Sequence, residues 1–531
     1  MVKIQTQSAE MNKPHHEEEE EAGPDQGTRS SLDYPPDEHT RLLPNRLEST
    51  PYLSPDDPAV SPYNLWSVRL VRFVTVVLTC LAFVWWVMML VSMFITPPGL
   101  HARGSPFFSF VYASIAFLTL LVELLFFSVP SKSVRILSFV TAVLLLVNVI
   151  VILAVQKTRH EELWVGVVSV VWATLMAVWA VVADRTVQWG KTEEEERLTG
   201  RPETRRTLLE WTQVLLSSAA LTLMAIAVLL MTTTLTLRAV DSRLSPPGER
   251  YWVDGNKYQI HLYCSGNKTD AKGNPATTVL IEAGEDAAER GLWQLAENAV
   301  KNGSISRYCF ADRPGIAWSD VAPSPLSASM ATDALSETLT RAGEKGPWVL
   351  ASAGIGSIYS RVFSSRHRHE VRGILMIDPL HEDLLGRVGA PGRGFMLWLQ
   401  GIISPCGIDR ILGALIRGRG SADRTWGRSA YQSSGTLFAK LQESLVANSF
   451  TKREVVSTRA VLQDEKTPVV VISSGVQIRR DSEWEAKQRD LTHLTKNLED
   501  WDIVDQAPHQ VWETLEGRKV IENRLRKLVK L

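Results

Sequence analysis

The chain has 531 residues, of which 45% are hydrophobic and 22% charged, and its formal net charge is -1. This near-neutral balance offers no basic face to a phosphate backbone, so nucleic-acid binding is not expected. Four cysteines exclude a disulfide-dense scaffold, and no Cys-x-x-Cys or Cys/His cluster has zinc spacing. We therefore predict no metal site and no cofactor.

Residues 1–64 form a polar, acidic head with many Pro, Ser and Asp residues. This composition is typical of a disordered tail, and no secretory signal opens it, so the first membrane span is expected to direct insertion. Within the head, Glu38, Leu42 and Leu43 form a string that resembles an acidic dileucine sorting signal. Cytosolic sorting adaptors bind such signals on proteins sent to endosomes and vacuoles, so adaptors are among the expected partners.

Five apolar stretches occupy residues 65–240. Each has about 20 residues, which is enough to cross a hydrocarbon layer of about 30 Å. The stretches are apolar on every face, which excludes a soluble amphipathic bundle. The predicted spans are 73–95, 107–129, 134–155, 163–183 and, approximately, 214–237. Membrane lipids are therefore the first expected partner.

Two strongly polar side chains, Glu123 and Asn148, lie well inside the predicted spans. An intramembrane carboxylate is by default a functional hypothesis. Glu123 nevertheless lies near the end of its span, and no second acidic or basic residue within the spans suggests an ion path. A transporter with an accessory domain is therefore the least favoured functional hypothesis.

Lys and Arg residues in the short loops are concentrated on the side of the membrane that holds the head. The positive-inside rule then predicts a cytosolic head and a luminal C-terminal domain. Two glycosylation acceptors, at Asn267 and Asn302, lie in that C-terminal domain and can be used only in the secretory lumen. Both observations favour the same orientation.

From residue 246 to residue 531, short β-branched runs alternate with amphipathic helices. This pattern is typical of a doubly wound, mainly parallel sheet with helices on both faces. The predicted strands are 258–263, 278–282, 307–311, 348–351, 373–377, 468–473 and 501–504.

Several blocks of this domain resemble the α/β-hydrolase superfamily, in the order that the superfamily has them. They are Thr278-Val-Leu-Ile-Glu-Ala-Gly284, Asp312-Arg-Pro-Gly, Ile374-Leu-Met-Ile-Asp378 and Ala507-Pro-His509. The resemblance covers the domain from end to end and implies an α/β-hydrolase-like fold. An insert at about 384–461 stands where that superfamily has a helical lid.

The superfamily carries its nucleophilic serine in a G-x-S-x-G turn between a strand and a helix. Here the turn reads Ser352-Ala-Gly354-Ile-Gly356, so the resemblance places Gly354 at the nucleophile position. A glycine has no side chain that could attack a carbonyl. Ser352 is the alternative nucleophile, but it requires a shifted turn in which Leu350 would crowd the backbone.

The other catalytic positions are kept. The resemblance assigns the general base to His509 and the orienting acid to Asp378, with Asp481 as the alternative acid. A domain that keeps the base and the acid but lacks the nucleophile is expected to be a degenerate enzyme.

The oxyanion region is also altered. By the same resemblance, Gly284, Glu285 and Ile355 surround the place where the superfamily stabilises an oxyanion. The carboxylates of Glu285 and Asp286 would repel a developing negative charge there. The same topology brings together the strands that carry Cys264 and Cys309, so a disulfide is expected in an oxidising lumen.

The whole arrangement resembles a fungal family of uncharacterised integral membrane proteins, some of them labelled mitochondrial. The acidic head is unlike a mitochondrial targeting segment, so we predict the endomembrane system (vacuole, endosome or ER) and keep mitochondria as the alternative. The leading hypothesis is a degenerate hydrolase domain that binds a lipid-like ligand or a protein partner. The alternative is an active membrane-bound serine hydrolase, similar to an esterase or lipase.

Overall fold

The computed structural model describes residues 60–201, 206–269, 273–463 and 466–530, and the dileucine string lies outside these ranges. Within them, five helices are long and apolar enough to cross a membrane. They are α1 (Trp66–Ser92), α2 (Pro106–Leu125), α3 (Lys132–Ala154), α4 (Gln156–Thr199) and α5 (Leu208–Asp241). All five predicted spans are confirmed as helices.

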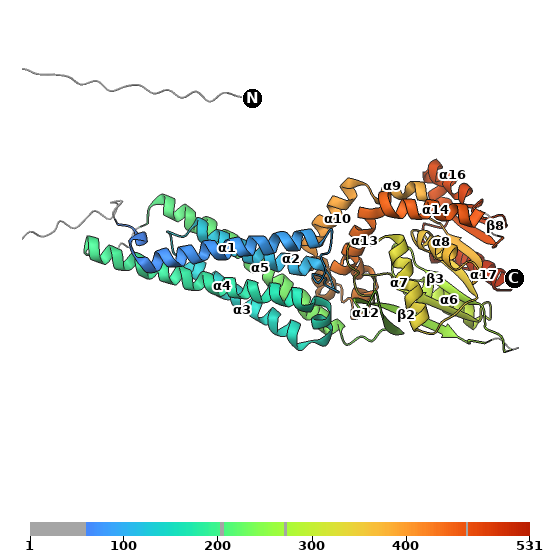
Figure 1. Cartoon of the computed structure of the whole chain (residues 1–531), viewed down its shortest axis with the longest axis horizontal. Helices are drawn as coiled ribbons and strands as arrows, with labels where there is room; N and C mark the ends of the chain where they lie inside the picture. Colours follow the sequence, from blue (N-terminus) through green and yellow to red (C-terminus); the bar gives the residue numbers. More distant parts are fainter. Residues whose placement is uncertain (1–59, 202–205, 270–272, 464–465, 531) are drawn as a thin grey trace, which may run out of the picture. The chain divides into compact units, whose positions relative to one another are not determined.

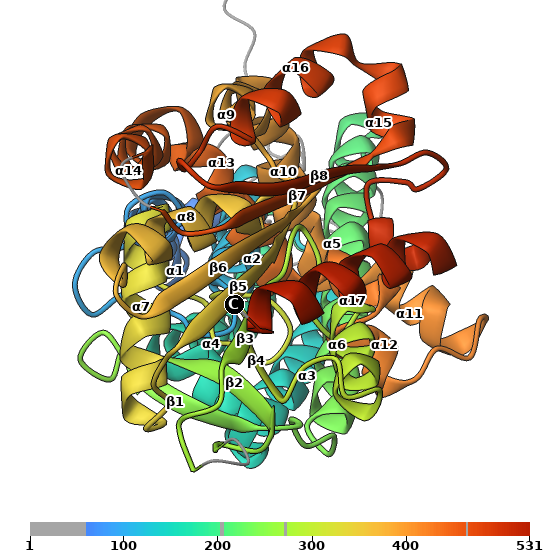
Figure 2. The ribbon, with the colours of Figure 1, turned by 90° about the vertical axis from the view of Figure 1, so that its right-hand side faces the viewer.

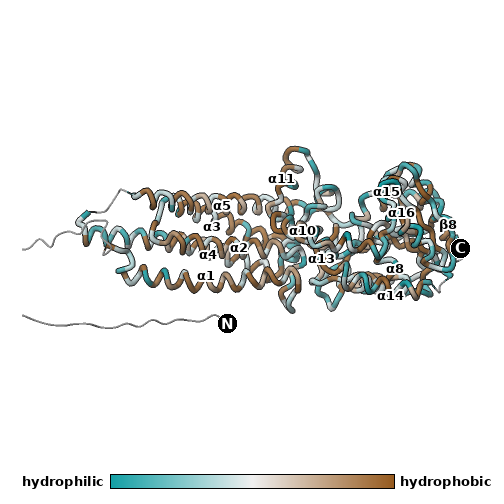
Figure 3. Tube along the Cα trace, turned by 90° about the horizontal axis from the view of Figure 1, so that it is seen from above, coloured by the Kyte–Doolittle hydropathy of each residue, from teal (hydrophilic) through white to brown (hydrophobic). Residues whose placement is uncertain are grey.

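The five helices pack side by side (Figure 1). The hydropathy colours show that they are apolar along most of their length (Figure 3). Their outward side chains are large and apolar, as lipid-facing residues are, and include Phe83, Leu146 and Leu223. Glu123 and Asn148 are both buried within the bundle. The two polar side chains therefore face neighbouring helices.

An eight-stranded sheet follows the bundle, with the strand order β1-β2-β4-β3-β5-β6-β7-β8 (Figure 2). The β1/β2 and β2/β4 pairs are antiparallel, and all other pairs are parallel. The strands are β1 (Glu249–Val253), β2 (Tyr258–Gly266), β3 (Thr278–Glu282), β4 (Arg307–Ala311), β5 (Trp348–Ala353), β6 (Val371–Ile377), β7 (Val469–Ser474) and β8 (Leu498–Val504). This topology is that of an α/β-hydrolase, as the sequence resemblance implied. Strand β1 was not predicted.

Helices cover both faces of the sheet because the central strands are buried on both sides. Along β3, Leu280 joins the core on one face, whereas Val279 and Ile281 join the core on the other. The first face carries α7 (Ala328–Arg341), α8 (Gly356–Arg366), α14 (Lys452–Gln463) and α16 (Ser482–Leu491), and the second carries α6 (Leu292–Lys301) and α17 (Leu515–Lys530) (Figure 2).

A disulfide joins the two strands at the antiparallel side of the sheet. Cys264 of β2 lies directly opposite Cys309 of β4, and their sulfur atoms are bonded. The covalent link ties β2 to the parallel part of the sheet.

The insert between β6 and β7 is called the lid below. Besides α14, its helices are α9 (Leu385–Val388), α10 (Pro391–Ile403), α11 (Ile408–Leu415), α12 (Ser421–Thr425) and α13 (Ser434–Val446). An apolar cluster that includes Phe107 of α2 and Phe438 of α13 packs the lid against the membrane helices. The two rings meet edge to face at 5.8 Å. Gly401 of α10 is so close to Phe107 that a Cβ on it would lie 2.0 Å from the ring. The lid is therefore held against the ends of the spans.

Candidate functional site

The turn between β5 and α8 has the geometry of a nucleophile elbow. Gly354 lies in it with φ +47°, a left-handed conformation that favours glycine. Its N–H donates to the carbonyl of Ile377 at 3.1 Å, and its carbonyl accepts from the N–H of Leu380 at 2.9 Å. These bonds fix the sharp strand-to-helix turn on which a hydrolase carries its nucleophile.

The space above Gly354 is filled by a carboxylate. A Cβ on Gly354 would lie 2.7 Å and 2.9 Å from the two carboxylate oxygens of Glu285, and 3.0 Å from Nε2 of His509. The elbow is therefore aimed at the histidine, as in a working hydrolase. Glu285 occupies the place that a nucleophile's side chain would take.

His509 lies between two carboxylates. Its Nδ1 is 2.6 Å from Oδ2 of Asp378, and its Nε2 is 3.2 Å from Oε2 of Glu285. The other oxygen of Asp378 accepts from the indole N–H of Trp484 at 3.0 Å and from the N–H of Ser474 at 3.1 Å. Asp378 is completely buried, so these bonds orient it firmly.

The two carboxylates change the protonation of the histidine. Burial by itself would lower the pKa of His509, but the hydrogen bonds and charges of Asp378 and Glu285 raise it to about 10. For Glu285 burial has the opposite effect and by itself would raise the pKa, but the hydrogen bond to His509 holds the pKa of Glu285 well below its usual range. At neutral pH the imidazole is therefore an imidazolium, whereas a general base must be neutral to accept a proton.

Ser352, the alternative nucleophile, lies in β5 rather than in the elbow. Its side chain is completely buried. Its hydroxyl donates to the carbonyl of Leu375 at 3.4 Å and accepts from the hydroxyl of Ser360 at 3.0 Å. A hydroxyl in this position supports the packing of β5 against α8 and has no route to a substrate.

Asp481, the alternative acid, has another role. Its carboxylate accepts from the N–H of Glu483 at the start of α16 and forms an ion pair with Arg387 at 2.5 Å. The geometry assigns the place beside His509 to Asp378, which corrects the alternative drawn from the sequence.

The oxyanion region is formed by the loop after β3. Arg313 donates to the carbonyl of Ala283 at 2.6 Å and to that of Gly284 at 2.5 Å. These bonds fix the start of the loop next to Ile355, which follows the elbow glycine. The carboxylate of Asp286 pairs with Arg290 at 2.9 Å and accepts from the side-chain amide of Gln510 at 2.7 Å. Of the two carboxylates predicted at this place, Glu285 is the one that enters it.

A cavity of about 1000 Å³ opens above the elbow, between the sheet and the lid. Glu285 and His509 lie at its base, and Leu397 of α10 lines it from the lid. Lys440 of α13 also lines it and is 4% exposed. Its ammonium nitrogen is 3.0 Å from the centre of the Tyr431 ring and has no hydrogen-bond acceptor among the described residues. The sequence pattern had given no sign of this buried cation.

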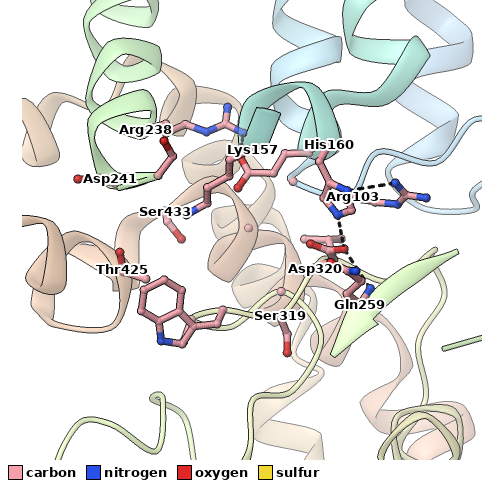
Figure 4. Close-up of a pocket in the computed structure, with 18 of the residues that line it drawn as sticks. Arg103, Lys157, His160, Arg238, Asp241, Gln259, Ser319, Asp320, Thr425 and Ser433 are labelled. Carbon is pink, nitrogen blue, oxygen red and sulfur yellow. Dashed lines mark hydrogen bonds and ion pairs between the residues drawn. The ribbon is translucent and has the colours of Figure 1, made fainter. Parts of the chain in front are cut away.

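A second cavity, of about 670 Å³, lies where the spans meet the sheet domain (Figure 4). His160 stands there between Arg103 and Asp320, and its Nε2 is 2.9 Å from the Asp320 carboxylate. On another wall, Arg424 of α12 pairs with Asp241 of α5 at 2.6 Å. These contacts join the two parts of the protein, so we regard the cavity as a polar junction.

The two glycosylation acceptors, Asn267 and Asn302, are both exposed. The side-chain amide of Asn302 donates to the carboxylate of Glu522 at 3.1 Å. Both positions are therefore accessible to a transferase.

Fold and site together define a multi-pass membrane protein with an α/β-hydrolase-fold domain. An uncharacterized protein of Schizosaccharomyces pombe is 32% identical to the chain over 529 residues, which cover 93% of this chain and 96% of that protein. The chain belongs to the same family of uncharacterized fungal membrane proteins. A family model described as a region of unknown function (DUF2417) matches residues 38–264.

A second relative is an uncharacterized vacuolar membrane protein of Saccharomyces cerevisiae. It is 26% identical over 385 residues, which cover 62% of this chain and 59% of that protein, so the match spans less than two thirds of its length. Among solved structures, haloalkane dehalogenase DbeA from Bradyrhizobium elkani covers 53% of this chain and 97% of its own, with 12% identity and a TM-score of 0.40. The fold assignment itself rests on the strand order and the elbow.

The raised pKa of His509 predicts how stability changes with pH. In the unfolded chain a histidine titrates near about 6.5. Between that value and the folded pKa of about 10, the folded state binds more protons than the unfolded state, so the stabilisation is full below about 6.5 and is lost as the pH rises towards 10. The melting-temperature advantage of the natural protein over His509→Gln should therefore shrink across this range. The exposed His493→Gln variant is the control, and a pH-independent advantage would contradict the imidazolium.

Proposed function

We propose that the hydrolase-fold domain is catalytically silent and serves to bind an anionic amphiphile of the membrane. The observation that carries this proposal is the carboxylate of Glu285, which fills the nucleophile's place above Gly354 and bonds to His509. A fold that keeps its base and acid but fixes the base as a cation can bind ligands without reacting with them.

Acyl transfer fails at three steps in this geometry. Gly354 offers no nucleophile to form an acyl intermediate. His509 is protonated and cannot take a proton from an attacking hydroxyl or water. Glu285 adds a negative charge where an oxyanion would develop, which raises the energy of the transition state. The three obstacles act together, so removing one of them is not expected to restore activity.

The cavity above the elbow has the size and charge of a binding site for an amphiphile. Its volume of about 1000 Å³ reaches the upper end of the range of roughly 300–1,000 Å³ that is usual for ligand pockets. Five basic side chains and three carboxylates line it. Glu285 and Asp286 are already paired with His509 and Arg290. A carboxylate or phosphate headgroup would supply the partner that the ammonium of Lys440 lacks.

The lid presents apolar side chains beside this cavity. Ile403 and Ile408 line the cavity and are half exposed. A cluster of exposed apolar residues at one end of the spans is expected to contact the outer part of the bilayer. The other exposed members on α10, α11 and the turn after α11 are Phe395, Met396, Leu399, Leu412, Leu415 and Ile416. These side chains offer an apolar route by which an amphiphile could pass between the bilayer and the cavity.

The place of action is inferred from independent features. The relative in Saccharomyces cerevisiae is named a vacuolar membrane protein, which supports an endomembrane location for this chain. The Cys264–Cys309 disulfide and the exposed acceptors Asn267 and Asn302 suit a luminal domain. These features support a cavity on the luminal side, next to the luminal leaflet of the organelle's membrane.

Catalytic silence can be tested with a fluorophosphonate probe, which labels activated serines. The natural protein should remain unlabelled in detergent, and so should Gly354→Ser, because Glu285 is still present to keep His509 protonated. The double variant Gly354→Ser/Glu285→Gly removes that carboxylate and leaves the Asp378–His509 pair, so it should gain labelling.

The matched control for this test is Gly354→Ala/Glu285→Gly, which has the same space but no hydroxyl. Labelling of the natural protein that is lost in Ser352→Ala would overturn the proposal and identify Ser352 as a displaced nucleophile.

Headgroup binding can be tested through Lys440. Oleate and oleoyl lysophosphatidic acid should raise the melting temperature of the purified protein, whereas neutral monoolein should not. A hydrogen bond to a charged group contributes roughly 1.5–3 kcal/mol, so Lys440→Gln should weaken the binding of the anionic lipid about ten- to a hundredfold. Lys440→Arg should retain most of it.

The two anionic lipids distinguish a carboxylate site from a phosphate site. An anion site in the cavity would be contradicted if monoolein raised the melting temperature as much as the anionic lipids do. It would also be contradicted if the anionic lipids raised the melting temperature of Lys440→Gln as much as that of the natural protein.

A further inference from the structure

A cluster of buried polar side chains lies beside the loop that carries Glu285. It consists of His261 on β2, Glu289 at the end of the loop after β3, and Asp312 directly after β4. One ligand atom from each residue lies within 4.8 Å of the others. The three residues are 0%, 5% and 2% exposed. Two carboxylates and an imidazole are thus gathered out of contact with water.

The hydrogen bonds within the cluster do not explain why these three ionisable side chains are buried together. Nδ1 of His261 is 2.8 Å from Oδ2 of Asp312. Both oxygens of Glu289 and Oδ1 of Asp312 are buried and find no donor in the described part of the chain. A buried carboxylate without a partner is strongly unfavourable, so the cluster needs either a cation or a proton.

The charges of Arg250 and Arg313 act on the cluster, but neither side chain donates a hydrogen bond to its unpaired carboxylate oxygens within the described ranges. Arg250 pairs with Asp320 instead. Arg313 follows Asp312 directly, but its guanidinium donates to the carbonyls of Ala283 and Gly284. With a neutral imidazole, the two carboxylates carry a charge of -2, which one divalent cation would balance.

We propose that His261, Glu289 and Asp312 bind a divalent metal ion, for which Zn²⁺ has the best-matched ligands. Zinc binds imidazole nitrogen and carboxylate oxygen at roughly 2.0–2.2 Å, which in tetrahedral geometry sets its ligand atoms roughly 3.3–3.6 Å apart. The ligand atoms here lie within 4.8 Å of one another, so binding requires the side chains to approach by up to about 1.5 Å. The carbonyl of Pro247 lies near the His261 ring, but Nε2 of His261 is buried and makes no hydrogen bond within the described ranges, so this nitrogen also lacks a partner.

The metal ion would stabilise the loop after β3, which carries Glu285. Glu289 follows Glu285 by four residues, and Arg313 holds the start of the same loop. An ion bound to Glu289 would fix the far end of the loop to β2 and β4. This role is structural and does not depend on what the cavity binds.

The competing explanation is a shared proton. The Glu289 and Asp312 carboxylates face each other closely enough to hydrogen-bond if one of them is protonated. Glutamine resembles a protonated glutamate in shape and charge but is a poor zinc ligand. Glu289→Gln therefore separates the two explanations.

The test measures metal content and stability in the full-length protein purified without chelators. Mass spectrometry of the elements should find about one zinc per chain in the natural protein and in Glu297→Gln, a carboxylate control on the surface of α6. Glu289→Gln should lose the zinc and melt at a lower temperature. A zinc chelator should lower the melting temperature of the natural protein and leave that of Glu289→Gln unchanged.

X-ray absorption at the zinc edge keeps the test decisive if Glu289→Gln does not fold. It should show a shell of nitrogen and oxygen with one imidazole and no sulfur. Three results would overturn the proposal. The natural protein could remain free of zinc after dialysis against a zinc salt, the absorption spectrum could show a sulfur ligand, or Glu289→Gln could match the natural protein in stability.

Discussion

The structure of the site depends on one contact, the bond between the carboxylate of Glu285 and His509 above a glycine elbow. In a working hydrolase this space holds a serine hydroxyl, and the histidine accepts its proton. Here the place is taken by a charge that makes the histidine a cation. Asp378, buried and held by Trp484 and Ser474, adds the second negative charge. Asp378, His509 and Glu285 thus form a chain of ion pairs at the elbow, and His509 and Glu285 also line the cavity.

The position of the cavity follows from the way the lid is held. In many hydrolases a lid moves over the site, whereas here α10 and α13 are packed against the membrane helices through Phe107, Gly401 and Phe438. Such close packing of backbone and ring leaves little freedom for the lid. The apolar edge of the lid therefore remains beside the ends of the spans, which is the position that the proposed binding of a membrane amphiphile requires.

Much of this architecture could be predicted from the sequence, because spans and buried strands leave strong local patterns. The elbow glycine, His509 and Asp378 were likewise visible through ordered motifs. Strand β1 was missed because it is a five-residue edge strand in which two charged residues precede two aromatic ones, so it shows neither an apolar run nor an alternation of apolar and polar residues. The contact of Glu285 with His509, the unpaired Lys440 and the cluster around Glu289 could not be predicted, because they join residues far apart in the chain and have no characteristic spacing. The expectation of no metal site relied on such spacing alone.

The most direct test of the account is a cryo-EM map of the full-length protein at neutral pH in nanodiscs of phosphatidylcholine with added lysophosphatidic acid. If the hydrolase site has become a binding site, the map should show density for the Glu285 carboxylate between Gly354 and His509, and an elongated density in the cavity whose head meets Lys440. A Glu285 side chain turned away from His509, together with an empty cavity, would rule out this role of the site.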